Sequence, residues 1–310
     1  MQYHEIGKTG MKVSSLSFGA SSLGGVFHDL KEKEGIQAVF TAVEAGMNFI
    51  DVSPYYGHYK AETILGKALK EIPREKYYLS TKVGRYGKDG VNTWDYSGKR
   101  ATESVYESME RLHIDYIDLI NVHDIEFADL HQVVEETLPA LVELKKKGVV
   151  GHVGITDLQL ENLKWVVDHA PEGTVETILN FCHYCLNDDA LTDYLDYFES
   201  KGVGIINASP FGMGLLSQRG VPDWHPAPKA LVEACQKAVQ HCQARHYPIE
   251  KLAIQYSVSN PRIASTLFSS ANPENVKKNI RYVEEPIDWN LVQEVKEIIG
   301  DQQRVSWLNS

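Results

Sequence analysis

Apolar residues occur along this chain in two alternating patterns, short continuous runs and longer stretches in which they recur at helical spacing. In the stretch 130–147, for example, Val134, Leu138 and Leu141 lie three or four positions apart and mark one buried face of a helix. The short runs are apolar at nearly every position, which is typical of strands covered on both faces of a parallel sheet. The alternation therefore predicts strands and helices in turn, and a parallel α/β fold.

The boundaries of these stretches predict eight strand–helix units. Residues 3–19 contain a hairpin, with its turn at Gly7 to Gly10, and then the first strand. The next six predicted strands are 48–53, 78–83, 117–123, 149–156, 177–184 and 203–209. The first six predicted helices are 33–45, 61–70, 101–112, 130–147, 160–169 and 188–200. A last strand and helix occupy 264–270 and 274–282.

Eight such units without an intervening linker predict a (β/α)8 barrel, a TIM barrel, that spans residues 1–310 as one domain. The N-terminal β-hairpin precedes the barrel, and the residues after 282 predict an extra C-terminal helix or loop. An open, doubly wound sheet is the alternative fold, but the sequence lacks the glycine fingerprint of its nucleotide-binding turn.

Charge and composition narrow the class of partner. The formal net charge is -11, and an acidic protein is poorly suited to bind the phosphates of a nucleic acid. No apolar run approaches the roughly 20 residues of a membrane-spanning helix, and we expect no secretory signal. We interpret Cys182, Cys185, Cys235 and Cys242 as reduced, buried thiols of a cytoplasmic protein, and expect no metal site. Because no coiled-coil pattern is present, we expect a monomer or a loose homodimer.

Four polar residues stand where predicted strands give way to loops, namely Asp51, Tyr56, Lys82 and His123. The C-terminal ends of barrel strands converge on one face, so these residues are expected to share one site. Taken singly, Asp51 could be a loop cap, and the two rings could serve packing. Lys82, however, lies within an apolar strand, where an unpaired charge is costly. Asp51 on the preceding strand is its expected partner.

These four residue types suit proton transfer. A free tyrosine has a pKa of about 10, and a lysine ammonium beside it is expected to lower that pKa and stabilise the tyrosinate. Tyr56 would take a proton from a hydroxyl while hydride leaves the same carbon, and His123 would orient the oxygen. No side chain accepts hydride, so the site implies a nicotinamide cofactor.

The motifs around these residues resemble those of the aldo-keto reductase family. They are FGA, IDVSPYYG followed by AETILGKAL, STKVGR, INVHD, GHVGITD and ASPFGMGLL. The resemblance extends from Tyr3 to about Glu284. It implies a (β/α)8 barrel that binds NAD(P) across its C-terminal face. It also implies that the four residues form a catalytic tetrad with Tyr56 as the general acid/base.

The resemblance further implies a set of cofactor-binding residues. They are Gly19, Ala20, Asp51, Thr156, Asn180, Ser209, Phe211, Gly212, Ser269, Ser270, Asn275 and Asn279. Two positions depart from the family pattern. Asp157 stands where an amide often holds the nicotinamide carboxamide, and we expect it not to donate a hydrogen bond as an amide would. Ala208 replaces the aromatic residue that often stacks on the nicotinamide ring.

The resemblance favours NAD over NADP as the cofactor. Family members that use NADP hold its 2′-phosphate with basic side chains after the eighth strand and at the start of the next helix. This chain has Ser269 and Asn275 in those places. A phosphate dianion binds poorly without a charged donor. Lys277 and Lys278 lie nearby in the sequence and are interpreted as solvated charges on the helix.

Further runs, among them ETLPALVELKKKG, PEGTVETIL and CHYCLND, resemble family members that oxidise free sugars. They imply NAD-dependent oxidation of the anomeric C1 hydroxyl of an aldose, in ascorbate biosynthesis or sugar catabolism. L-galactose is the expected substrate, and L-fucose or a D-threo-aldose is the alternative. The candidate substrate-binding residues are Tyr56, His123, Asp124, His183 and Trp224.

Two alternatives lie outside sugar oxidation. One is an NADPH-dependent carbonyl reductase, which the neutral Ser269 and Asn275 disfavour. The other belongs to a different class, a regulatory subunit that binds NAD(P) as a redox sensor, and the presence of a complete tetrad argues against it only mildly.

Overall fold

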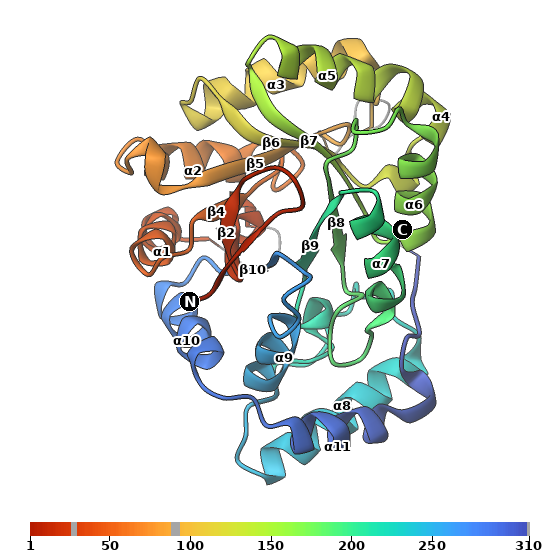
Figure 1. The fold of residues 1–310 in the computed structure, drawn as a ribbon. Coiled ribbons are helices and arrows are strands. Elements are labelled where there is room, and N and C mark those ends of the chain that lie inside the picture. The colour runs from red at the N-terminus through yellow and green to blue at the C-terminus, as the bar shows by residue number, and fades with distance from the viewer. Residues whose placement is uncertain (26–29, 88–93, 309–310) are drawn as a thin grey trace.

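Eight parallel strands close into a barrel within the residues that the computed structural model describes, 1–25, 30–87 and 94–308 (Figure 1). The barrel strands are β3 (Leu16–Gly19), β4 (Phe49–Asp51), β5 (Tyr78–Val83), β6 (Ile117–Val122), β7 (Val150–Asp157), β8 (Thr177–Phe181), β9 (Gly204–Ala208) and β10 (Ser265–Ser269). They pair in chain order, and β10 pairs with β3 to close the ring. The (β/α)8 barrel predicted from the sequence is confirmed.

Helices surround this barrel on the outside (Figure 1). Those that the sequence predicts are α1 (Glu32–Glu44), α2 (Lys60–Leu69), α3 (Gly98–Leu112), α5 (Leu138–Lys146), α6 (Leu160–His169), α7 (Leu195–Ser200) and α10 (Pro273–Glu284). The sequence analysis placed no helix between residues 210 and 263, where the structure has α8 (Lys229–Ala244) and α9 (Ile249–Ser257). α8 packs against the extra C-terminal helix α11 (Trp289–Ile299), at the lower edge of Figure 1.

The predicted helix over 130–147 changes its winding near the middle. It begins as α4 (Leu130–Gln132), widens into a π-helical turn over Val133–Thr137, and continues as α5. Pro139 at the start of α5 has no N–H to donate to the preceding turn, which accounts for the local widening.

Two other predicted elements differ at their ends. The stretch 188–200 forms a 3-10 turn over Ala190–Tyr194 before α7 begins. The strand predicted over 177–184 ends at Phe181, because Cys182 has a φ of 65° and no longer continues the extended backbone.

The N-terminal hairpin, β1 (Tyr3–Glu5) and β2 (Lys12–Ser14), covers the end of the barrel at which the strands begin. Its turn lies so close to β9 that a Cβ atom on Gly7 would be 2.5 Å from the Gly204 nitrogen. Ile6, Met11 and Val13 of the hairpin pack into the same hydrophobic cluster as residues of the barrel interior. The hairpin therefore closes one end of the barrel, and the strand C-termini at the other end remain for a site.

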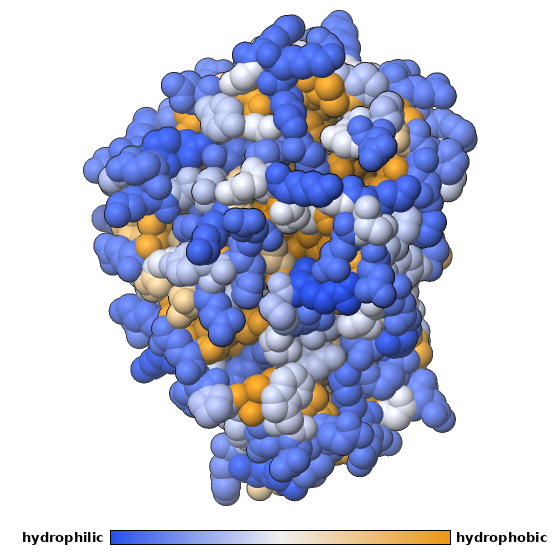
Figure 2. All heavy atoms as spheres, viewed as in Figure 1, coloured by the Kyte–Doolittle hydropathy of each residue, from blue (hydrophilic) through white to orange (hydrophobic). Residues whose placement is uncertain are grey.

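The face of the molecule seen in Figure 2 is mainly hydrophilic, and its hydrophobic patches are separated by polar side chains. All four cysteines are buried free thiols, as expected. Within the described part of the chain, no helix combines the length and the apolar character needed to cross a membrane. Among the same residues, no group of three or more His, Cys, Asp or Glu side chains is placed to hold a metal ion.

Candidate active site

The structure brings the four predicted catalytic residues together at the C-terminal ends of neighbouring strands. Asp51 is the last residue of β4, Lys82 lies near the end of β5, and His123 directly follows β6. Tyr56 lies in the loop after β4, and its ring meets the His123 ring edge-on with centroids 5.7 Å apart. The Lys82 ammonium is 4.9 Å from the centroid of the Tyr56 ring. Asp51, Lys82 and His123 are buried, and the partly buried Tyr56 completes one polar cluster with them.

Lys82 and Asp51 form the ion pair that the sequence predicts. Lys82 Nζ donates to Asp51 Oδ1 and to the Val52 carbonyl at 2.9 Å. Asp51 Oδ2 accepts a hydrogen bond of 2.8 Å from the Ser80 hydroxyl. Burial alone would lower the pKa of Lys82, which is 1% exposed, but the charges and hydrogen bonds of Asp51 and Tyr56 together outweigh burial and raise it. Lys82 therefore stays an ammonium at neutral pH.

The pKa of the Tyr56 phenol differs from the sequence-based expectation. Burial raises the pKa of Tyr56 above its ordinary value of 10.0, the positive charge of Lys82 lowers it by a smaller amount, and Asp51 and Asp124 raise it further. Lys82 thus offsets part of the cost of burying a tyrosinate without bringing the pKa to neutrality. In this protein Tyr56 is a neutral phenol at pH 7 that can donate a proton or, as tyrosinate, accept one.

A contact between two glycines positions Tyr56. The loop that carries it runs against the 3-10 turn Ser21–Gly24. A Cβ atom on Gly24 would lie 2.6 Å from the Tyr56 carbonyl carbon, and one on Gly57 would lie 2.1 Å from the Gly24 carbonyl oxygen. Gly57 also has a φ of 62°. Only residues without a side chain allow this approach of the two backbones.

His123 is neutral and its ring orientation is fixed from one side. Its Nδ1 lies 3.0 Å from the Ser53 hydroxyl, which also accepts from the Tyr55 backbone N–H at 3.1 Å. Its Nε2 lies 3.5 Å from the carboxylate oxygen Oδ2 of Asp124. These neighbours favour the tautomer with its proton on Nε2. Burial, followed by the charges of Lys82 and Arg85, lowers the pKa of His123 well below 6.5, so the ring acts as a neutral hydrogen-bond donor.

The three remaining predicted substrate residues have different surroundings. Asp124 lies beside His123 and is buried, whereas Trp224 is 53% exposed and stacks on His225. His183 is buried, and its Nδ1 lies 2.9 Å from Asp188 Oδ2. The geometry therefore joins Asp124 to the tetrad and gives His183 a partner of its own.

The predicted cofactor residues lie at the C-terminal ends of β3, β7, β8, β9 and β10 and in the first turns of α10. They therefore occupy the same face of the barrel as the tetrad. Asn180 donates to the carbonyls of Asp157 and Leu158 at 2.8 and 2.9 Å. Its buried Oδ1 has no hydrogen-bond partner within the part of the chain that the structure describes. A buried acceptor without a partner suits the amide group of a nicotinamide.

Two pairs of hydroxyl contacts shape the rest of this face. The Ser269 hydroxyl accepts from the Ser22 backbone N–H and bonds to the Ser22 hydroxyl, both at 2.8 Å. Thr156 is occupied by Asp124, whose backbone N–H donates to the Thr156 hydroxyl at 2.9 Å. Apart from Asp51, the predicted cofactor residues are uncharged, and they suit a nicotinamide dinucleotide.

Comparison with known proteins agrees with this geometry. The model of the aldo/keto reductase family matches residues 15–300 of this chain. The chain belongs to the aldo-keto reductase family. It is 44% identical to L-galactose dehydrogenase of Arabidopsis thaliana over 313 residues, which covers 99% of this chain and 97% of the relative. It is 32% identical to D-arabinose 1-dehydrogenase of Saccharomyces cerevisiae over 259 residues, which covers 80% and 76% of the two chains.

The fold has a solved counterpart in the holo form of an aldo-keto reductase from Bacillus halodurans. The two structures share 25% sequence identity and a TM-score of 0.79, over 98% of this chain and 100% of that one. This aldo-keto reductase is therefore an oxidoreductase, in a family whose enzymes bind a nicotinamide cofactor.

Asp157 behaves differently in this aldo-keto reductase from the carboxylate that the sequence analysis assumed. Burial first, and then a hydrogen bond to Glu126 and the charge of Glu126, raise the pKa of the Asp157 carboxyl well above its ordinary range. Its two oxygens accept from the Gln159 backbone N–H at 2.8 Å and from Asn162 at 3.0 Å. As the acceptor of both of these hydrogen bonds, Asp157 secures the start of α6.

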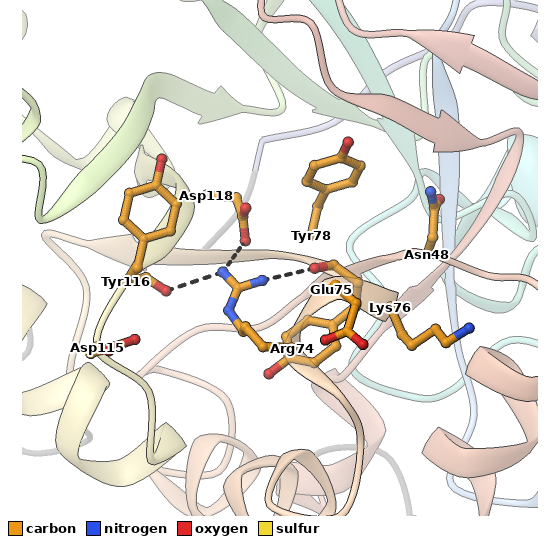
Figure 3. Close-up of a pocket in the computed structure, with 9 residues that line it drawn as sticks. Asn48, Arg74, Glu75, Lys76, Tyr78, Asp115, Tyr116 and Asp118 are labelled. Atoms are coloured by element: carbon orange, nitrogen blue, oxygen red, sulfur yellow. Dashed lines mark hydrogen bonds and ion pairs between the residues drawn. The ribbon is translucent and has the colours of Figure 1, made fainter.

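A cavity of about 500 Å³ lies at the opposite end of the barrel strands from the tetrad (Figure 3). Asn48 just before β4, Tyr78 at the start of β5 and Tyr116 just before β6 line it. Arg74 crosses it and donates to Asp118 and to the carbonyls of Tyr77 and Tyr116. These hydrogen bonds hold the Arg74 guanidinium against the strand starts, so we interpret the cavity as structural.

The structure adds three residues to the site that sequence reasoning did not select. Ser53 contacts His123, Ser80 contacts Asp51, and the Arg85 guanidinium pairs with Asp124 at 2.5 Å. Their positions in the sequence gave a partial signal, since each lies within three residues of a tetrad member or of its strand end. Serine and arginine are common near strand ends, however, and their partners depend on how the loops cross.

Proposed function

We propose that this aldo-keto reductase oxidises the anomeric C1 hydroxyl of a free aldose with NAD, and that L-galactose, converted to L-galactonolactone, is its substrate. The observation that supports the proposal best is the 44% identity to an L-galactose dehydrogenase along nearly the whole chain, together with a fully assembled tetrad. The 32% identity to a D-arabinose 1-dehydrogenase supports aldose oxidation as the general reaction. L-fucose and D-threo-aldoses are the nearest alternative substrates.

In this proposal Tyr56 accepts the proton of the C1 hydroxyl, and His123 donates a hydrogen bond through Nε2 to the same oxygen. Bound NAD supplies the acceptor for the hydride that leaves C1. Lys82, held by Asp51, keeps a positive charge beside the developing tyrosinate and lowers its energy. The O–H and C1–H bonds break as the proton passes to Tyr56 and the hydride to NAD, and a C=O double bond forms between C1 and its oxygen, so the intact ring becomes a lactone.

The proposed preference for NAD over NADP is supported by the residues at β10 and α10. Ser269 is occupied by Ser22, and Asn275 is a neutral side chain in the first turn of α10. The nearby Lys277 forms an ion pair of 2.8 Å with Glu274. None of these three side chains offers an unpaired positive charge to a 2′-phosphate.

Replacement of the tetrad tyrosine tests the proposal. Tyr56→Phe removes the hydroxyl that takes the proton, so we expect kcat for L-galactose oxidation to fall by about 10³-fold or more. The Kd for NAD, measured by calorimetry, should change less than about threefold, because the ring and its packing remain. Tyr106→Phe on the exposed face of α3 is the matched control. Retained turnover in Tyr56→Phe would contradict the assignment.

A further inference from the structure

A caged arginine holds Asp124 beside the tetrad. The Arg85 guanidinium carbon lies 3.6 Å from the centroid of the Tyr55 ring, 4.3 Å from that of Trp94 and 5.0 Å from that of Phe127. The three rings come from separate segments, the loop after β4, the chain before α3 and the 3-10 turn after β6. Arg85 also pairs with Asp124 at 2.5 Å. Four segments of the chain thus meet around one ion pair.

This arrangement is costly, which argues that it has a purpose beyond stability. Asp124 is 6% exposed, and a buried ion pair gives back little more than the desolvation of its two charges. Asp124 also has a φ of 44° and a ψ of 65°, a left-handed conformation that is uncommon for residues other than glycine, although aspartate adopts it more readily than most. Backbone strain of this kind tends to collect at functional sites.

The two carboxylate oxygens of Asp124 lie within reach of the reacting end of the site. Oδ2 lies 3.5 Å from His123 Nε2, the atom proposed to hold the substrate oxygen. Oδ1 lies 3.3 Å from the Thr156 hydroxyl. Burial raises the pKa of the Asp124 carboxyl, and the charge of Arg85 acts against that rise. The ion pair with Arg85 favours the carboxylate form of Asp124, so an acceptor stands next to the position of the C1 oxygen.

The chemistry of a pyranose decides what such an acceptor can bind. The anomeric carbon has two neighbours in the ring, the ring oxygen and C2. The ring oxygen carries no hydrogen, so it cannot donate to a carboxylate, whereas the hydroxyl on C2 can. Vicinal hydroxyl oxygens lie about 3 Å apart, so neighbouring hydroxyls can each reach one of His123 Nε2 and Asp124 Oδ2, which lie 3.5 Å from one another.

We propose that Asp124 accepts a hydrogen bond from the 2-hydroxyl of the aldose, and that Arg85, fixed by its aromatic cage, positions Asp124 for this contact. The inference rests on the proposed function and narrows it to aldoses that carry a free hydroxyl next to the anomeric carbon. Asp124 is then a specificity-determining residue, and Arg85 acts through it as a positioning residue.

A comparison of deoxy sugars tests this inference on the unmodified enzyme. We expect kcat/KM for 2-deoxy-L-galactose to be about 100-fold below that for L-galactose, because a site built to bind a hydroxyl is left with a buried acceptor that lacks this hydrogen bond when the hydroxyl is missing. L-fucose, which is 6-deoxy-L-galactose, is the control and should lose less than about tenfold. Equal rates with and without the 2-hydroxyl would overturn the inference while leaving aldose oxidation in place. Failure to oxidise any aldose would overturn the proposed function and this inference with it.

Variants of Asp124 assign the contact to that side chain. In Asp124→Ala the 100-fold preference over the 2-deoxy sugar should shrink to less than about fivefold, while the ratio of L-galactose to L-fucose changes little. Asp124→Asn keeps the shape and one neutral acceptor, so its kcat/KM should still favour L-galactose over the 2-deoxy sugar by about tenfold. This variant serves as the test if Asp124→Ala folds poorly. Asp196→Ala, at an exposed carboxylate, is the matched control. An unchanged preference in both Asp124 variants would contradict the assignment.

Discussion

The pKa values of the side chains in this site depend strongly on burial and on neighbouring charges. Lys82 is buried and Tyr56 is partly buried, and burial raises the pKa of the phenol and acts against the charge of the ammonium. The presence of Asp51 decides the outcome for Lys82, whereas no neighbour fully compensates Tyr56. The sequence allowed the pairing of Lys82 with Asp51 to be predicted, because a lysine in an apolar strand requires a carboxylate.

Other features of the same residues could not be predicted from the sequence. The pKa of Tyr56 depends on how deeply the loop after β4 is buried, and that depth follows from the contact of two glycines distant in sequence. The raised pKa of Asp157 depends on burial and on Glu126, which arrives from a different loop. Ser53 and Arg85 acquire their roles only when these loops meet.

The directions of these pKa shifts predict how the oxidation rate depends on pH. Oxidation needs Tyr56 as tyrosinate, and its raised pKa means that this fraction grows about tenfold per pH unit throughout the range below the pKa. The pKa of Lys82 is raised and that of His123 is well below 6.5, so neither changes its charge in this range. We expect log kcat/KM for the aldose to rise with a slope near one from about pH 6 to pH 9. A flat profile, measured with NAD saturating, would contradict Tyr56 as the base.

At the level of elements, periodicity predicted most of the strands and the helices that pack on them. The strands ended within a few residues of their predicted limits, since runs of buried residues stop where the backbone turns. The prediction failed where one fold element departs from the repeating unit. α8 and α9 were both missed, with α8 an addition before α9, and the π-helical turn ahead of α5 depends on Pro139 rather than on spacing.

The glycine contact between the turn Ser21–Gly24 and the Tyr56 loop gives a prediction at this level. Gly24→Ala places a Cβ atom 2.6 Å from the Tyr56 backbone, so the loop must move. We expect kcat/KM to fall by about 10-fold to 100-fold, because small displacements of a reacting group are costly, and the free energy of unfolding to fall by about 1–3 kcal/mol.

Gly173→Ala is the control for this variant. Gly173 has a φ of 79° and open space around it, in the turn between α6 and β8 at the opposite end of the strands. We expect a loss of stability from backbone strain without a loss of activity. Equal kinetics in Gly24→Ala and the wild-type enzyme would show that this contact does not position Tyr56.

At the scale of the whole molecule, the chain closes the barrel at one end and reinforces loops at the other. The N-terminal hairpin fills the end where the strands begin. The C-terminal segment after α11 crosses towards the opposite face, where the Trp307 carbonyl accepts from Gln159 and the Trp307 ring packs 5.0 Å from His225. His225 in turn lies 3.0 Å from the Gly212 carbonyl, in the segment predicted to hold the cofactor. The barrel and hairpin were predictable from the sequence, whereas the path of this segment was not, because its contacts are with loops rather than with a repeating face.

The central claim is that this face of the barrel oxidises an aldose at C1 with NAD. Its most direct test is the initial rate of NADH formation by the purified protein with L-galactose, L-fucose, D-arabinose and no sugar, with NADP in place of NAD in a parallel series. We predict the highest kcat/KM with L-galactose and NAD, and a rate with NADP at least about tenfold lower, because Ser269 and Asn275 offer no charge to a 2′-phosphate. No NADH formation with any of the sugars, from protein that binds NAD, would contradict the claim and favour a carbonyl reductase or a redox sensor instead.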